Sequence, residues 1–179
     1  MKKLLLAAAL STFACAALAE DRFYAGGNVA FWNYTEGSHD TKISVSSLEG
    51  VAGFNVWSVI NIEGRVGLGL ESSTESVNTK EFGKLSTELT LDNYFSVYIK
   101  PELKNDTATV YALLGVTRAD ASTTSLKVER DLSMTGLSYG LGMGFYVTES
   151  ALVNLEFRNL VQEDDYKFQG FSAGFTLSF

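Results

Sequence analysis

Residues 167–179 read KFQGFSAGFTLSF, and they give the clearest indication of the fold. Apolar side chains occupy every second position and end on the aromatic Phe179, while Gly, Ser and Thr fill the positions between them. A period of two predicts a β-strand with one apolar face and one face of small polar side chains. Chain ends usually fray and are polar, so this apolar end predicts a terminus that is held in place.

Residues 1–19 have the features of a secretory signal. Lys2 and Lys3 precede an apolar run, and Ala17, Leu18 and Ala19 form a small-x-small cleavage triplet. The run is too short and too rich in alanine for a membrane helix. We therefore expect cleavage after Ala19, which leaves one mature domain over residues 20–179.

Composition restricts the class of protein further. The only cysteine, Cys15, lies inside the signal, so we expect no disulfide in the mature chain. A lipid anchor at Cys15 is disfavoured because Thr12 stands where a leucine-like residue is needed. The formal net charge of −7 gives no electrostatic case for nucleic-acid binding. Beyond Ala19 no apolar run reaches the ~18 residues that a membrane helix needs, so a membrane span must be made of strands.

Alternation like that of residues 167–179 recurs along the chain in segments of about ten residues, the pattern of a transmembrane β-barrel. In the fourth segment Leu89, Leu91 and Phe95 are expected on one apolar face. The fifth is ambiguous, because residues 111–116 are apolar at both parities. The sequence predicts eight antiparallel strands, over about 22–34, 44–56, 61–70, 85–103, 109–118, 136–147, 151–161 and 167–179.

The connections between these strands alternate between long and short. Short turns are expected at 57–59, 104–108 and 148–150, and long polar loops at 35–42, 71–84, 119–131 and 159–166. Outer-membrane barrels have short periplasmic turns and longer extracellular loops. We therefore assign the four long connections to the outside of the cell.

The polar face of the strands is predicted to line the lumen. A soluble calyx has the same alternation with its apolar face inward, but its outer face should then be rich in charge. Here the polar face is mostly Gly, Ser, Asn and Tyr, which suits a confined interior. Buried charges must be paired, so we predict one lumen network from Glu63, Arg65, Glu88, Asp92, Lys100, Glu156 and Arg158.

Aromatic residues gather near the predicted strand ends. Such rings settle at the two interfaces of a bilayer, so these residues are expected to form girdles, although core packing would also accommodate them. The set is Phe23, Phe31, Trp32, Tyr34, Trp57, Tyr94, Phe95, Phe145, Tyr146, Tyr166, Phe168 and Phe179.

Over its mature length the sequence resembles the small outer-membrane β-barrel family that includes OmpA-type transmembrane domains and OmpX/Ail-type surface proteins. Phe171, Phe175, Leu177 and Phe179 match the C-terminal signal that the barrel-assembly machinery reads in that family. The resemblance implies an eight-stranded monomeric barrel in the outer membrane, with no enzymatic activity. No sequence feature predicts a cofactor.

These features favour a role in envelope integrity and surface display through the outer connections, with an unknown surface ligand. Basic residues near the predicted outer strand ends are candidates to meet lipopolysaccharide phosphates, namely Lys42, Lys84, Lys127, Arg130 and Lys167. A narrow ion channel is an alternative, but the interior of an eight-stranded barrel is only wide enough to be filled by side chains.

A lipid A modifying enzyme is the alternative from another class. His39, the only histidine, stands between Ser38 and Asp40, but sequence neighbours on a polar loop rarely have the geometry of a catalytic triad. Residues 163–165 are acidic, yet their spacing matches no calcium-binding loop. We therefore predict no catalytic residue and no metal ligand.

Overall fold

The computed structural model describes residues 22–36, 39–70, 72–79, 83–125, 128–163 and 166–179. Side chains are described within these ranges except over 35–43, 72–79, 83–89, 123–125, 128–132, 162–163 and at residue 166. Among the described residues, no helix has the length and apolar character needed to cross a membrane.

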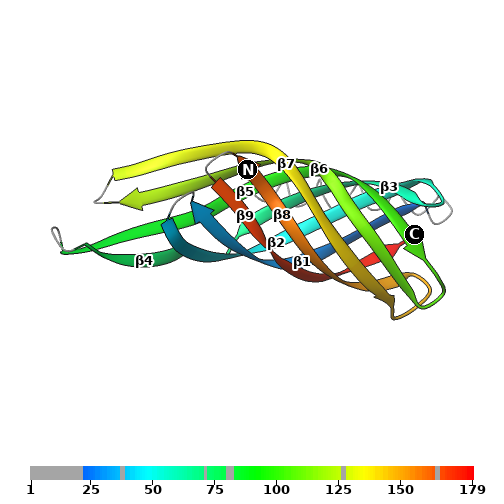
Figure 1. The fold of residues 1–179 in the computed structure, drawn as a ribbon. Helices are drawn as coiled ribbons and strands as arrows, with labels where there is room; N and C mark the ends of the chain where they lie inside the picture. Colours follow the sequence, from blue (N-terminus) through cyan, green and yellow to red (C-terminus); the bar gives the residue numbers. More distant parts are fainter. Residues whose placement is uncertain (1–21, 37–38, 71, 80–82, 126–127, 164–165) are drawn as a thin grey trace, which may run out of the picture.

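The described chain is an antiparallel β-sheet closed into a barrel (Figure 1). Its strands are β1 (Phe23–Glu36), β2 (His39–Trp57), β3 (Ile60–Gly69), β4 (Ser72–Thr79), β5 (Gly83–Lys104), β6 (Ala108–Ser125), β7 (Val128–Tyr146), β8 (Ala151–Glu163) and β9 (Tyr166–Ser178). They pair in the order β3-β2-β1-β9-β8-β7-β6-β5-β4, and β3 also pairs with β5, which closes the sheet.

The barrel has eight strands because β3 and β4 are successive parts of one. Both pair with β5, because Leu68 of β3 lies opposite Asn93 of β5 and Ser72 of β4 lies opposite Thr90 of β5. The predicted eight-stranded, all-antiparallel barrel is therefore confirmed.

The long polar loops were a wrong prediction. Residues 72–79 form β4 and pair with the start of β5, while β6 and β7 continue as a hairpin to Ser125 and Val128. These polar segments continue strands that are already hydrogen-bonded to their neighbours. Backbone hydrogen bonds can extend a strand pair without any alternation of apolar and polar side chains, so the sequence pattern does not reveal the extension. The extended β4, β5, β6 and β7 project beyond one rim of the barrel, on the left in Figure 1.

The short turns lie at the other rim, where the chain also ends (Figure 1). Asn105 closes one of them, because its Oδ1 accepts hydrogen bonds from the backbone N–H groups of Thr107 and Ala108 at 2.9 and 2.8 Å. Backbone hydrogen bonds in both directions join Phe179 to Phe23. The terminal aromatic is thus held beside the start of β1, as the sequence predicts.

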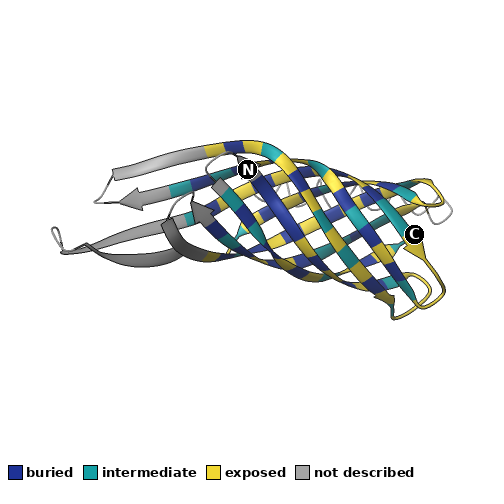
Figure 2. Ribbon diagram, viewed as in Figure 1, coloured by how far each residue is buried: buried dark blue, intermediate teal, exposed yellow. Residues whose placement is uncertain are grey.

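The apolar face of the strands points outward and the polar face inward. Figure 2 shows exposed and buried residues alternating along each strand over the barrel wall. Large apolar side chains are exposed all around this wall and define an apolar belt, which includes Phe31, Leu48, Val66, Phe95, Val116, Leu141, Phe157 and Phe171. The ambiguous strand is also resolved, because Tyr111 and Leu113 are buried while Leu114 and Val116 are exposed.

One face assignment in β5 was wrong. Leu91 is fully buried inside the barrel, whereas Phe95, four residues later, belongs to the exposed apolar belt. The register between β5 and β6 shifts between Leu91 and Asn93, so β5 carries one extra residue there. Such a β-bulge reverses the alternation, and the simple period of two fails across it.

Small residues on the inner face leave room for large ones. A Cβ atom added to Gly142 on β7 would collide with the ring of Tyr111, and one added to Gly67 on β3 would collide with the ring of Tyr94. Gly140 and Gly142 pair with Arg158 and Glu156 of β8, as the alternation of small and long side chains predicts. The lumen is therefore filled by side chains.

Candidate functional site

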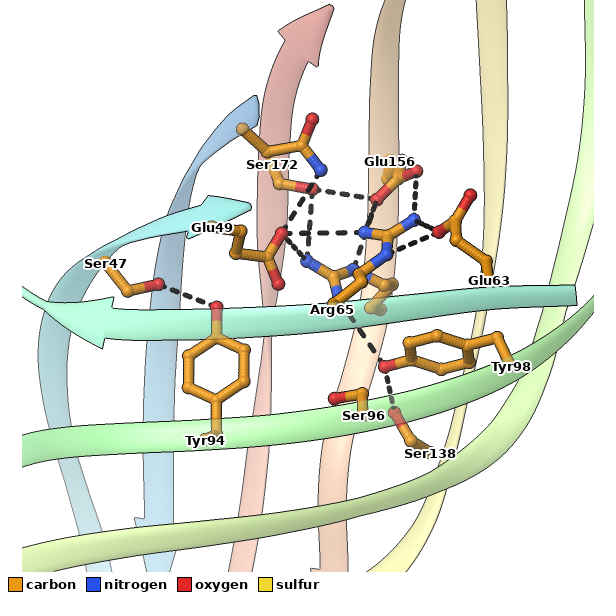
Figure 3. Close-up of polar contacts among 12 residues, drawn as sticks. Ser47, Glu49, Glu63, Arg65, Tyr94, Ser96, Tyr98, Ser138, Glu156 and Ser172 are labelled. Atoms are coloured by element: carbon orange, nitrogen blue, oxygen red, sulfur yellow. Dashed lines mark hydrogen bonds and ion pairs between the residues drawn. The ribbon is translucent and has the colours of Figure 1, made fainter. Parts of the chain in front are cut away.

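The charged residues of the lumen come from four strands. Glu63 and Arg65 are two residues apart on β3, and Glu156 and Arg158 are two apart on β8, so each pair shares the inner face. Glu49 on β2 and Lys100 on β5 complete a group of six, which we call the lumen network. All six are at most 5% exposed, and Figure 3 shows several of them converging at the middle of the barrel.

Arg65 is the centre of the network. Its Nη1 and Nη2 atoms donate to the two carboxylate oxygens of Glu156 at 2.6 and 2.8 Å, which is a bidentate pair. Its Nε donates to Glu63 Oε1 at 2.6 Å, and its Nη1 lies 3.5 Å from Glu49 Oε2. A planar guanidinium suits this task because its five N–H groups can serve several carboxylates at once.

Arg158 joins Glu49 to the same centre. Its Nη2 donates to Glu49 Oε2 at 2.5 Å, while its Nε lies 3.2 Å from Glu156 Oε2 without the geometry of a hydrogen bond. The guanidinium also sits over the ring of Trp32, 4.9 Å from its centroid. Such cation–π contacts gain strength where water is excluded.

Lys100 and two tyrosines hold the side of the network that faces the short turns. Lys100 Nζ donates to Glu63 Oε2 at 3.1 Å and lies 4.8 and 4.2 Å from the ring centroids of Tyr24 and Tyr111. The hydroxyls of Tyr24 and Tyr111 donate to Glu63 and Glu156, both at 2.7 Å. Beside these groups, at this end of the lumen, lies a small cavity of about 60 Å³.

The lumen network is balanced in charge. Three carboxylates, of Glu49, Glu63 and Glu156, face three cations, of Arg65, Lys100 and Arg158. A buried charge is tolerated when it is paired and hydrogen-bonded, and removing one partner leaves another uncompensated. This arrangement links β2, β3, β5 and β8 through charged side chains across the lumen.

A second layer of side chains fills the lumen on the side of the projecting strands. We call it the apolar cluster, and it consists of Ala30, Trp32, Tyr34, Val45, Leu91, Tyr94, Ala119, Ala121, Met134, Leu160, Val161 and Phe168. Ser47 joins its polar atoms, because its Oγ accepts from Trp32 Nε1 at 2.8 Å and lies 2.9 Å from the Tyr94 hydroxyl. Side chains thus fill the lumen in two layers, one of paired charges and one of apolar packing.

This cluster corrects part of the predicted aromatic girdles. Trp32, Tyr34, Tyr94 and Phe168 point into the lumen, whereas Phe31, Phe95 and Trp57 are exposed on the outer surface. The sequence could have indicated this inward orientation, because Trp32 and Tyr34 share the parity of Asn28 and Ala30, which point inward on β1.

The structure brings together Glu63, Arg65, Lys100, Glu156 and Arg158, and it adds Glu49, which sequence reasoning missed. Glu49 shares the inner face of β2 with Ser47 and Val51, so its parity was the available signal.

Asp92 was wrongly assigned to the network. It points outward at the bulge of β5 and accepts a hydrogen bond from the Ser122 hydroxyl at 2.6 Å. The extra residue at this bulge moves the Asp92 side chain from the inner to the outer face.

The remaining predicted residues fall into two groups. The first group lies outside the part of the chain whose side chains the structure describes. It comprises Glu88, His39, Asp40, Lys42, Lys84, Lys127, Arg130, residues 37–38 and the acidic stretch 163–165. On β9, Lys167 is half-buried, and Phe171, Phe175 and Leu177 are exposed on the apolar belt.

The sequence matches the family model described as outer membrane protein beta-barrel domain over residues 4–179. The comparison with curated proteins found no match. The crystal structure of Ail, the attachment invasion locus protein of Yersinia pestis, aligns with a TM-score of 0.60 at 18% identity, covering 90% of this chain and 100% of Ail.

Two further solved structures have the same fold. Neisserial surface protein A aligns with a TM-score of 0.63 at 12% identity, over 88% of this chain and 97% of its own. The outer membrane protein OprG from Pseudomonas aeruginosa aligns with a TM-score of 0.57 at 13% identity, over 89% and 97%. At such identities the likeness concerns the fold alone.

Proposed function

Because the chain belongs to the outer membrane protein β-barrel family, and so lies in the outer membrane, we propose that it is a closed structural barrel that displays its projecting strands at the cell surface. The observation that carries this proposal is the charge-balanced lumen network, in which Arg65 and Arg158 form ion pairs with carboxylates of three strands. The role is structural and requires no catalytic residue.

The two layers of the lumen argue against conduction. An ion would have to separate Arg65 from Glu156, a bidentate pair at 2.6 and 2.8 Å, and then pass Trp32, Leu91 and Tyr94 in the apolar cluster. Ions lose their hydration in an apolar constriction, which is how such layers close pores. The interior of an eight-stranded barrel is narrow enough for side chains to achieve this.

The orientation follows from the two rims. The short turns and the C-terminus share one rim, which we assign to the periplasm, and β4, β5, β6 and β7 project from the other (Figure 1). We propose that residues 1–19 are removed on export and that the mature barrel is monomeric. The barrel-assembly machinery would read Phe171, Phe175, Leu177 and Phe179, which form the end of β9 and the C-terminus.

Planar-bilayer recording tests the closed lumen. We expect protein whose folding has been verified by its altered mobility on unboiled gels to insert without stable unitary current steps. Steps of constant size that disappear in a Glu63→Gln, Arg65→Gln variant would overturn the closed-barrel proposal. Steps that persist unchanged in that variant would indicate a contaminant, so the purified protein must be free of them.

Tag insertion tests the display. A short epitope placed between residues 126 and 127, in the segment between the end of β6 at Ser125 and the start of β7 at Val128, should be bound by antibody on intact cells. The same epitope in the turn after Thr148 should be bound only after the outer membrane is permeabilised. The reverse pattern would contradict the assigned orientation, while both variants retain the gel shift of the folded barrel.

A further inference from the structure

The lumen opens into a small polar cavity at the rim that carries the short turns. Its volume of about 60 Å³ has space for roughly four water-sized groups. Among the described residues that line it, only Leu152 lacks a polar side chain. The cavity therefore suits a small polar group rather than an acyl chain.

Asn61 supplies this cavity with a buried hydrogen-bond donor. The residue is 2% exposed and lies on β3 between Asn55 of β2 and Lys100 of β5. Its side-chain nitrogen Nδ2 has no hydrogen-bond partner in the part of the chain that the structure describes. A buried N–H group that lacks an acceptor is costly. Because Asn61 lines the cavity, an acceptor placed inside the cavity would satisfy this group.

Three cations line the same cavity, and two of them lie outside the lumen network. Lys100 is paired within the network, whereas Arg22 forms no ion pair with any described residue. Lys104 Nζ lies 3.7 Å from an oxygen of Glu102, which is too long for a hydrogen bond. The backbone of Arg22 is fixed at the mouth, because its carbonyl accepts from the Asn55 N–H at 2.8 Å. Two cations beside a buried N–H donor suit the oxygens of a carboxylate.

An open cleft continues from the cavity over the rim. It has a volume of about 700 Å³, lies between the turn at 105–107 and the turn at 147–150, and shares Lys104 and Tyr146 with the cavity. Its other charged residues are Asp106 and Glu149, which are both acidic. The volume is that of a site for a small ligand. Cations thus line the cavity, and carboxylates line the part of the cleft beyond it.

We propose that this mouth binds a short peptide by its free carboxyl terminus. The carboxylate enters the cavity, where it accepts from Asn61 Nδ2 and meets Arg22 and Lys104. The rest of the peptide lies in the cleft, where Asp106 and Glu149 meet its amino group. The inference goes beyond the closed barrel and does not depend on closure of the lumen. Only its location in the periplasm rests on the proposed orientation, which the epitope insertions test separately.

Titration with trialanine tests the site directly. In isotope-labelled protein folded in detergent micelles, the side-chain amide of Asn61 can be assigned through bonds to its own backbone and followed by NMR. We expect trialanine to shift this signal to saturation and trialanine amide, which lacks the carboxylate, to leave it in place. Equal shifts with the two peptides, or no shift with trialanine, would overturn the proposal.

Substitutions of opposite sign test the role of charge. An Arg22→Gln, Lys104→Gln variant should bind trialanine about fivefold to tenfold more weakly. Glu102→Gln should bind it more tightly, because the Glu102 carboxylate competes with the peptide for Lys104. The matched control Arg118→Gln, Lys167→Gln, which removes two cations outside the cavity, should bind like the unchanged protein. Equal weakening in the control would show that net charge alone attracts the peptide and would overturn the site.

The amino end of the peptide tests the cleft. An Asp106→Asn, Glu149→Gln variant should bind trialanine more weakly but N-acetyl-trialanine no more weakly, because the acetyl group removes the peptide's positive charge. Unchanged binding of trialanine would overturn the placement of the peptide in the cleft. Every variant must first show the gel shift of the folded barrel.

Discussion

At the scale of single residues, Glu156 is the side chain on which the lumen depends most. It accepts hydrogen bonds from Arg65, Tyr111 and Ser172 and lies 3.2 Å from Arg158. In a Glu156→Gln variant two buried guanidinium groups would share the remaining carboxylates, so we expect the free energy of unfolding to fall by about 3–5 kcal/mol. Urea unfolding in lipid vesicles measures this loss.

The control for that substitution is Glu149→Gln, because Glu149 lies exposed in a turn at the rim. Exposed substitutions of this kind change stability by about 0.5 kcal/mol or less. Equal losses in the two variants would show that the lumen network contributes nothing specific to stability.

Two glycines of the barrel wall should respond differently to the same added methyl group. Gly142 faces the lumen, where a new Cβ would collide with the ring of Tyr111, the tyrosine that donates to Glu156. Gly64 faces the lipid, and its new Cβ would have only one neighbour within contact distance, at 3.9 Å. We expect Gly142→Ala to cost about 1–3 kcal/mol and Gly64→Ala to change the free energy of unfolding by less than about 0.5 kcal/mol. Parallel urea titrations of the two variants measure both changes in the free energy of unfolding.

At the scale of the strand, alternation predicted the closed eight-stranded barrel and its outward apolar face, because each membrane segment has an apolar parity. It failed over residues 72–79, which are polar at both parities except for Val77 and belong to a strand through backbone pairing alone. It also failed at the bulge of β5, since an extra residue leaves no mark in composition. Glu49 was missed although its parity places it on the inner face of β2 with Ser47 and Val51, where it meets Arg65 of β3 and Arg158 of β8.

The bulge of β5 predicts which residue of the wall can be deleted. Without Asp92, Leu91 and Tyr94 would still point inward in regular alternation, and the register with β6 would become continuous. On its other side β5 pairs with β3 and β4, and the mismatch in register there would fall at the break between these two strands. We expect the Asp92 deletion to fold, as judged by its mobility on unboiled gels.

A matched deletion of Asn28 should not fold. Asn28 lies in β1, which pairs with β9 without any irregularity and with β2 without one before Thr35. Deleting it would turn either Phe23 or Trp32 to the wrong face, together with every residue on that side. Recovery of the gel shift in the Asn28 deletion, or its loss in the Asp92 deletion, would contradict the role of the bulge.

At the scale of the whole molecule, the barrel exposes apolar side chains around its wall and buries charged and polar side chains in its lumen. The two tryptophans of the sequence report on its two faces. Trp57 is 66% exposed at the end of β2, near the short turns, while Trp32 is fully buried between Ser47 and the Arg158 guanidinium. Indole rings at a membrane interface lie within reach of acyl chains, whereas a ring in the lumen does not.

Fluorescence quenching can therefore test the orientation of both faces in one experiment. In vesicles of brominated phosphatidylcholine, a Trp32→Phe variant, which retains Trp57, should lose much of its emission relative to vesicles without bromine. A Trp57→Phe variant, which retains Trp32, should keep its emission, because the backbone of the barrel wall and the outward side chains separate the Trp32 ring from the brominated acyl chains. If Trp32 were quenched as strongly as Trp57, the face that carries Trp32 would contact lipid. This result would contradict the assignment of the polar face to the lumen. Both variants must first show the gel shift of the folded barrel, because unfolded chains would expose both rings equally.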